Sequence, residues 1–379
     1  MKTCTLTWDH QNRLRGDVAA SSPDVVILFG PRELVAAPEL FSDFRTRFPA
    51  SHVLGCSTGG QIHDGVVSDA EVVGLGLDFA ETTLRFASTE IKAHAGSREA
   101  GQALGRRLAC TSLAGIFVLA DGLALNGTDF VAGLAEAVGE HIPLMGGLAG
   151  DGARFEQTLV IADAAGRPGI AAAVGFYGEA VRLHHGHAGG WDRFGPKRRI
   201  TRSRDNILFE LDGRPALELY ERYLGEEAAG LPGTGLLFPL RIFNPANPDH
   251  DVVRTLLAID REQGSVTFAG SMPQGWVAQL MRGSLDRLAH GAGMAADHAR
   301  IPDNWTGEGA AFLISCIGRR LLMGQRTGEE VAAVRAALRR TMPVVGFYSY
   351  GEISPHLVSG FSELHNQTMT VMTITERAA

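Results

Sequence analysis

An apolar strand that runs into a glycine turn occurs three times in this chain of 379 residues. The three stretches are SHVLGCSTGGQI (51–62), HIPLMGGLAGDG (141–152) and TMPVVGFYSYGEISP (341–355). Each is preceded by an apolar strand, a loop and a segment whose apolar residues have helical spacing. Because a crossover helix commonly joins parallel neighbouring strands, the pattern predicts three strand–loop–helix–strand units with parallel strand pairs.

Antiparallel strands are predicted around these units. Alternating apolar sequence follows each glycine turn, and FPLRIFN, VVRTLLAID and SVTFAG in the second half have the same character. The expected fold class is therefore mixed, α+β with α/β pieces. It has two domains built on repeated strand–loop–helix–strand units with added antiparallel strands. Gly, Trp and Pro interrupt GGWDRFGP, which places the boundary near residue 190 and predicts domains 1–189 and 190–379.

Composition and charge exclude several classes of function. A net charge of −7 argues against a general nucleic-acid binder. No apolar run is long enough for a signal peptide or a membrane span, so we expect a cytoplasmic protein with no membrane partner. The four cysteines are scattered, which disfavours a structural zinc site or a disulfide framework. No Walker loop, G-x-S-x-G or H-E-x-x-H motif is present, and we expect no enzymatic activity.

The glycine-turn motifs resemble those of the FIST domain family of bacterial sensory proteins. In the first half the resemblance lies in VLGCSTGGQI and in PLMGGLAGD followed by F-x-x-T. In the second half it lies in ITRSRDNILFELDGRPALELY, SCIGRR, PVVGFYSYGEISP and HNQTMTV. Together these motifs span nearly the whole chain. The resemblance implies a cytosolic sensor with an N-terminal and a C-terminal FIST domain, which binds a small molecule such as an amino acid and acts on a separate signalling protein.

Two stretches are similar to a haem-binding, nitric-oxide-sensing subset of stand-alone FIST proteins, the NosP type. They are HHGHAGGWDRFGPKRRIT and GLPGTGLLFPL. This similarity implies a haem cofactor, nitric oxide as the signal, and a histidine kinase or a cyclic-dinucleotide enzyme as the partner. A homodimer is left open. The alternative is a haem-free FIST sensor of amino acids or another small metabolite.

The histidines of VRLHHGHAGGW are the candidate haem ligands. If this stretch is extended, His185 and His187 share a face with aliphatic residues, whereas His184 lies on the other face. A haem iron is commonly held by one histidine in an apolar pocket, so His185 is the first candidate ligand and His187 the second. Loss of His185 should therefore release most haem. The competing interpretation is that these are surface histidines. Arg198 could pair with a propionate or an amino-acid carboxylate, or belong to a solvated strand edge.

The glycine turns supply the remaining candidate ligand contacts. Loops at the carboxyl ends of strands are the usual ligand sites of α/β proteins, so we expect the three turns to converge on one interdomain cleft. The candidate contacts are Cys56, Ser57, Gly147, Tyr348, Tyr350, Glu352, His365 and Asn366. The last two could instead only cap a strand. A third hypothesis, an enzyme with Cys56 or Cys316 as nucleophile, requires a thiol whose pKa is lowered by a basic partner.

Overall fold

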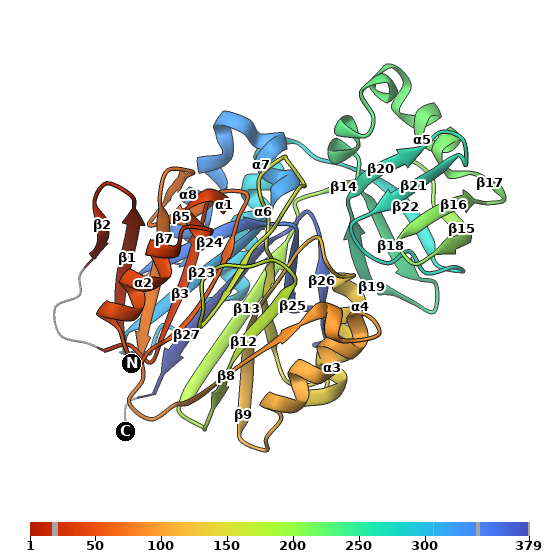
Figure 1. Ribbon diagram of the computed structural model, residues 1–379. Helices are drawn as coiled ribbons and strands as arrows, with labels where there is room; N and C mark the ends of the chain where they lie inside the picture. The colour runs from red at the N-terminus through yellow and green to blue at the C-terminus, as the bar shows by residue number, and fades with distance from the viewer. Residues whose placement is uncertain (17–21, 306, 339–341, 378–379) are drawn as a thin grey trace.

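The computed structural model describes residues 1–379 except 17–21, 306, 339–341 and 378–379 (Figure 1). Within the described residues the strands form four sheets, three of six strands and one of nine. The three six-stranded sheets make a body, and the nine-stranded sheet makes a lobe over residues 192–282 at one side of it (Figure 1). The predicted mixed α+β class is confirmed.

Each sheet of the body contains one of the three predicted units. The first sheet has the order β11 (Val160–Ala162), β4 (His52–Ser57), β3 (Val25–Gly30), β7 (Val72–Asp78), β1 (Lys2–Asp9), β2 (Arg13–Gly16). The second has the order β26 (Ser362–His365), β25 (Gly351–Pro355), β10 (Leu144–Leu148), β9 (Leu113–Ala120), β12 (Ile170–Tyr177), β8 (Thr83–Glu90). The third has the order β13 (Val181–Ala188), β27 (Met369–Glu376), β23 (Gly309–Cys316), β24 (Val344–Ser349), β5 (Gln61–His63), β6 (Val66–Ser68).

The parallel pairing predicted for the three units is confirmed. Strand β3 pairs in parallel with β4, β9 with β10, and β23 with β24. Every other pairing between named strands of the described chain is antiparallel. Helices cross between the paired strands: α1 (Arg32–Val35) and α2 (Pro38–Arg47), α4 (Gly127–Val138), and α7 (Ile317–Met323) with α8 (Thr327–Leu338). Two further body helices are α3 (Ser97–Leu108) and α6 (Leu285–His298).

The three sheets share one central core. The rings of Phe29 and Phe347 stack at 4.6 Å between the first and third sheets, and those of Phe117 and Phe312 lie 5.1 Å apart between the second and third. The helices bury their apolar faces on the outer sides of the sheets, as Phe44 of α2 does on the first sheet. The inward faces of the sheets thus contact one another rather than solvent, which explains why the paired strands are apolar along their whole length.

One glycine occupies the same place in all three units. Gly55, Gly146 and Gly346 each stand in the second strand, beside a register partner in the first. A Cβ added to them would lie 2.7, 1.9 and 2.0 Å, respectively, from the carbonyl oxygen of that partner. The partners are Leu28, Val118 and Leu313. The glycine therefore recurs because the second strand passes too close to the first for any side chain.

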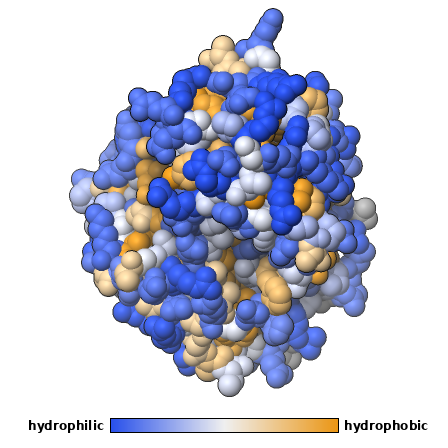
Figure 2. Space-filling view, turned by 90° about the vertical axis from the view of Figure 1, so that its right-hand side faces the viewer, coloured by the Kyte–Doolittle hydropathy of each residue, from blue (hydrophilic) through white to orange (hydrophobic). Residues whose placement is uncertain are grey.

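The lobe is an antiparallel sheet with one helix packed on it. Its order is β19 (Asn247–Arg254), β18 (Leu240–Asn244), β22 (Val277–Arg282), β15 (Arg198–Arg204), β16 (Ile207–Leu211), β21 (Ser265–Phe268), β20 (Leu256–Asp260). Two short strands complete it, β14 (Asp192–Arg193) on β22 and β17 (Arg214–Pro215) on β16. Helix α5 (Ala216–Leu224) buries Tyr220 against Phe268, with ring centres 6.3 Å apart. The face of the molecule on the lobe side is mostly hydrophilic, with apolar residues in scattered groups (Figure 2).

The two halves of the chain exchange strands within the body. The hairpin β5–β6 from the first half pairs with β24, and β25–β26 from the second half pairs with β10. Strand β13 pairs along its whole length with β27 near the end of the described chain. Two of the four sheets thus contain strands from both sides of residue 190. The boundary near residue 190 stays a prediction, and the lobe begins just after it, at Asp192.

Candidate functional site

The three glycine turns meet, as the repeated pattern led us to expect. Their backbones are joined directly, so the carboxyl ends of the three parallel strand pairs lie at one junction. Three hydrogen bonds make the connection: Gly59 N to Tyr348 O (2.7 Å), Gly150 N to Ser57 O (2.9 Å) and Tyr350 N to Leu148 O (3.1 Å). Pockets open beside this junction.

A pocket of about 340 Å³ lies between this junction and the lobe. We call it the interdomain pocket. The body contributes mainly the loop after β9, the start of α4, and residues of the second and third turns: Gly122, Leu123, Leu125, Asn126, Gly127, Leu148, Phe155, Cys316, Ile317 and Tyr350. The lobe contributes Asn206, Leu236, Thr255, Leu257, Phe268, Ala269 and Gly270. An apolar pocket with a few polar groups between two units is a typical ligand site.

The hydroxyl of Thr255 is a polar group of this pocket that has no hydrogen-bond partner among the described residues. Its side chain is 2% exposed, and among the described residues Oγ1 has no hydrogen-bond partner. The other polar side chains are occupied: Asn206 donates to Phe268 O at 2.7 Å, and Asn126 caps α4 by accepting from the backbone of its first turn. A buried hydroxyl without a partner is costly, which makes Oγ1 of Thr255 the natural contact for a ligand.

Tyr350 forms the wall of the pocket on the body side. Its phenol donates to the carboxylate of Asp151, and its ring stacks on Phe155 with centres 4.6 Å apart. Asp151 is itself fixed by the backbone N–H groups of residues 155, 156 and 157. Burial raises the pKa of Tyr350, so the phenol stays protonated. Of the candidate contacts predicted in the third turn, Tyr350 is thus placed at the interdomain pocket.

Three other predicted contacts lie in the interior instead. Cys56 is fully buried, and burial raises the pKa of its thiol well above the usual value. Ser57 Oγ accepts a hydrogen bond from Leu159 N at 2.8 Å. Gly147 is packed so closely that an added Cβ would lie 2.9 Å from Ile314. None of the three lines the interdomain pocket; the first turn instead contributes Thr58 and Gly59 to a second pocket, of about 630 Å³.

Tyr348 and Glu352 belong to buried hydrogen-bond networks. The Tyr348 hydroxyl donates to Glu330 at 2.8 Å, and both side chains are fully buried. Glu352 accepts from Ser349 Oγ at 2.9 Å and from Thr368 Oγ1 at 2.7 Å. Burial nevertheless raises the pKa of Glu352 to about 8, so the carboxyl is largely protonated at neutral pH. Neither residue lines the interdomain pocket.

The predicted alternation of the histidine strand is present in β13. Gly186 lies against Ala295 of α6, and an added Cβ there would meet its carbonyl oxygen at 2.2 Å. His185 and His187 therefore point away from α6, whereas His184 shares the side of Arg182. The Nδ1 atom of His185 and the Nε2 atom of His187 are buried and have no hydrogen-bond partner among the described residues.

His187 belongs to a cluster of four histidines at the seam between body and lobe. The centre of its ring lies 4.0 Å from the ring centre of His365 and 5.6 Å from that of His356. The ring centres of His356 and His250 are 4.4 Å apart. Burial lowers the pKa of His187 to about 3 and that of His365 well below its usual value, which keeps both neutral. The sequence pattern indicated His187 and His365 but not His250 and His356, because these two lie far from the histidine strand in the sequence.

The cluster offers a donor for a haem iron, beside a pocket that is small for haem. His187 lines a pocket of about 290 Å³, below the usual range for ligand pockets of about 300–1,000 Å³. Asp249 and Asp251 line it too; Asp251 is paired with Arg241 at 2.7 Å, so Asp249 is the carboxylate that would repel a haem propionate. His185, the first candidate, does not line it. Arg198 lies in the lobe, where it donates to Tyr223 and pairs with Asp212 at 3.0 Å.

The two remaining candidate contacts, His365 and Asn366, lie at the end of β26 and directly after it. His365 is buried, with Nε2 3.1 Å from Ser354 O, so its place in the sheet is fixed by the backbone. Asn366 is fully buried, and neither atom of its amide has a hydrogen-bond partner among the described residues. Cys316 lines the interdomain pocket, but burial raises the pKa of its thiol to about 12. That shift disfavours Cys316 as a nucleophile.

The junction of turns and the pocket between body and lobe define a ligand-binding protein of mixed α+β architecture. The model of the FIST N domain matches residues 24–214, and the model of the FIST C domain matches residues 216–355. The chain therefore belongs to the FIST family, whose domains are small-ligand sensing domains of signalling proteins. No curated protein matches the chain significantly. Over the described residues, helices long and apolar enough to cross a bilayer are absent.

Proposed function

We propose that this chain is a small-ligand sensor whose ligand binds in the interdomain pocket and is read out as a change in the contact between body and lobe. The observation that carries the proposal is the unpartnered, buried hydroxyl of Thr255 in a mostly apolar pocket. Thr255 and Leu257 come from the lobe, while Tyr350 and Leu148 come from the body. A ligand that contacts both sides binds best when they are close, and so it shifts the equilibrium toward that arrangement.

The lining of the pocket narrows the class of ligand. Its residues include no Arg, Lys, Asp or Glu, so the pocket supplies no ion pair for a carboxylate or an ammonium group. A volume of about 340 Å³ suits a small molecule. We therefore favour a small, largely apolar and uncharged metabolite with one hydrogen-bonding group, rather than an amino acid held by arginine. A separate histidine kinase or cyclic-dinucleotide enzyme is the proposed receiver, on the resemblance alone.

Replacing Thr255 with valine should weaken ligand binding about 10-fold, because valine keeps the shape but removes the hydroxyl. Ligands would be found by a thermal-shift screen of small neutral metabolites, and affinities measured by titration calorimetry. Leu257→Trp should block the pocket, since Leu257 is 42% exposed at its rim. Thr83→Val, at an exposed position of β8, is the matched control. Hits that bind Leu257→Trp and Thr255→Val as tightly as the unaltered protein would place the ligand elsewhere.

Haem with nitric oxide as signal is the second candidate function, favoured by the unpartnered Nε2 of His187. A bound haem would supply the iron that nitric oxide ligates, and His187 would hold it. On this hypothesis, protein expressed with added hemin shows a Soret band that His187→Ala loses and His185→Ala retains. This order reverses the one expected from strand alternation, because of these two residues His187 lines the pocket of about 290 Å³ and His185 does not. Colourless protein that takes up no hemin would exclude haem.

A further inference from the structure

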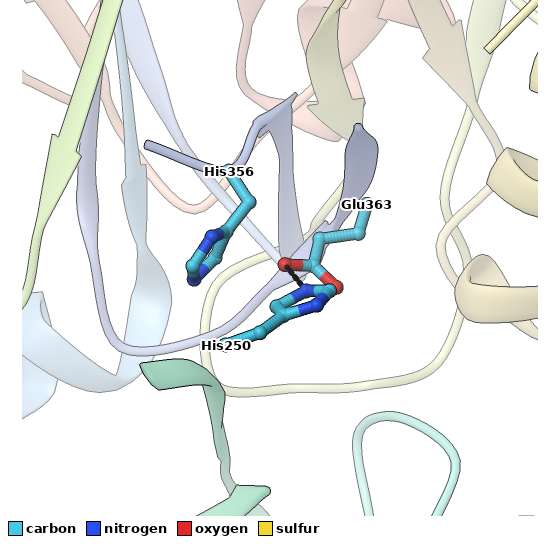
Figure 3. Close-up of side chains that lie close together, drawn as sticks. All are labelled: His250, His356 and Glu363. Carbon is cyan, nitrogen blue, oxygen red and sulfur yellow. Dashed lines mark hydrogen bonds and ion pairs between the residues drawn. The ribbon is translucent and has the colours of Figure 1, made fainter. Parts of the chain in front are cut away.

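Three side chains at the seam between body and lobe bring their donor atoms together. His250, His356 and Glu363 each offer one nitrogen or oxygen, and these atoms all lie within 4.8 Å of one another (Figure 3). His250 Nε2 is 3.0 Å from Glu363 Oε1. Figure 3 shows the imidazole of His250 beneath the Glu363 carboxylate and the ring of His356 facing the same space. Two imidazoles and a carboxylate are a donor set that transition-metal ions favour.

The three donors come from different parts of the chain. His250 lies on β19 of the lobe, whereas Glu363 lies on β26 and His356 directly after β25, both in the body. The strands β25 and β26 are adjacent and antiparallel, which fixes the two body donors relative to each other. A metal ion bound here would join lobe and body.

The backbone already orients the ring of His356. Its Nδ1 atom accepts from Val358 N at 3.2 Å, and its Nε2 atom lies 3.2 Å from Asp251 O. Metal-binding histidines commonly bond a backbone carbonyl or carboxylate through their second nitrogen, which sets the ring orientation. Metal binding through Nδ1 would replace the hydrogen bond from Val358 N and keep the Nε2–H contact to Asp251 O.

We infer that His250, His356 and Glu363 bind a divalent transition-metal ion, with zinc as the first expectation. Imidazole nitrogens disfavour Mg²⁺ and Ca²⁺, which prefer oxygen ligands. Two histidines and one glutamate suit Zn²⁺ and also Fe²⁺, and each would keep an open coordination position. The ring centre of His187 lies 5.6 Å from that of His356.

The site would regulate the interdomain pocket, a consequence that rests on the proposed function. Strand β19 leads from His250 to Arg254, which donates to Leu364 O at 3.1 Å in the body. The next residue is Thr255, the candidate ligand contact. A metal ion at His250 would hold β19 against β26 and so restrict movement of the lobe beside the pocket. Ligand affinity should then differ between metal-loaded and metal-free protein.

The test is calorimetric titration of the full chain, stripped with EDTA and dialysed, with ZnCl₂ and, under anaerobic conditions, with Fe²⁺. We expect one ion per chain, and binding at least about 100-fold weaker in Glu363→Gln and in His356→Ala. Zn²⁺ should raise the melting temperature of the unaltered protein and not that of these variants. His290→Ala, an exposed histidine of α6, is the matched control and should bind normally.

Glu363→Gln keeps a hydrogen-bonding partner for His250, so it should fold even if His356→Ala does not. Equal Zn²⁺ affinity in Glu363→Gln and the unaltered protein would overturn the site, as would failure of the unaltered protein to bind either ion. Tighter binding of Fe²⁺ than Zn²⁺ would support the site and change the assigned ion. Because metal binding is measured without ligand, and ligand binding can be measured in EDTA, failure of one proposal is distinguishable from failure of the other.

Discussion

Replacing Arg319 with leucine is expected to lower the free energy of unfolding by about 3–5 kcal/mol, because it leaves the buried carboxylate of Glu330 without its counter-ion. Both side chains are 0% exposed, and their charged groups are 2.8 Å apart. Glu330 also accepts from Ser315 Oγ at 3.0 Å and from the Tyr348 hydroxyl at 2.8 Å. Those hydrogen bonds stabilise the carboxylate but do not neutralise it.

Arg319 also holds together segments that are far apart in the sequence. Its guanidinium donates to Leu288 O in α6 at 2.8 Å and to Gly189 O after β13 at 2.5 Å. It also lies 3.3 Å from Gln367 O in the turn between β26 and β27. Leucine would remove these donors, which adds to the cost, although Gln367 O keeps the hydrogen bond from Trp191 Nε1 at 2.8 Å.

Urea unfolding followed by circular dichroism would measure the effect. The double variant Arg319→Leu, Glu330→Leu should be more stable than Arg319→Leu alone, because no unpaired charge remains. Arg326→Leu is the control, since Arg326 pairs with Glu329 at 2.7 Å on the surface and should cost at most about 1 kcal/mol. A loss below 1 kcal/mol for Arg319→Leu would show that the pair is not desolvated as the structure indicates.

Gly146→Ala should be similarly damaging, by about 2–6 kcal/mol, because two penalties add. The residue has φ +133°, where a side chain is strained by about 1–3 kcal/mol, and its Cβ would lie 1.9 Å from Val118 O. Forcing the strands apart costs typically a further 1–3 kcal/mol. Since β10 lies between β9 and β25, the displacement would disturb the sheet on both sides.

The equivalent glycines provide a graded series. Gly346→Ala meets Leu313 O at 2.0 Å, whereas Gly55→Ala meets Leu28 O at 2.7 Å, so the expected losses fall in the order Gly146, Gly346, Gly55. Gly328→Ala, in α8 with no atom within 4 Å of the added Cβ, should instead stabilise by about 0.5–1 kcal/mol. Equal midpoints of urea unfolding for all four variants would refute the close approach of the second strand to the first in each unit.

The three units could be predicted because their signals are local. An apolar run, helical spacing and a glycine lie within about 35 residues in each, and the parallel pairing follows from the crossover. The side of β13 that carries His185 and His187 follows from alternation alone. The position of Tyr350 at a ligand pocket also follows from a local signal, because Tyr350 directly follows a strand at a glycine turn.

What could not be predicted depends on pairings between distant segments. Nothing in the local pattern of β5 says that it joins β24, because any amphipathic hairpin satisfies the same alternation. The contact between His250 and His356 could not be predicted for the same reason. The two residues meet only because β19 of the lobe lies beside β26. Thr255 carried no signal either, since its lack of a partner is a property of the packed pocket.

The exchange of strands between the two halves has a consequence for synthesis on the ribosome. The edge of β10 stays unpaired until β25 is made, and Gly351 follows Leu148 by 203 positions. At a translation rate of about 5–20 residues per second, that delay is roughly 10–40 s. For this time the nascent chain presents an open, apolar sheet edge, a known hazard for aggregation. We therefore expect the newly made first half to need protection from aggregation until the last strands emerge.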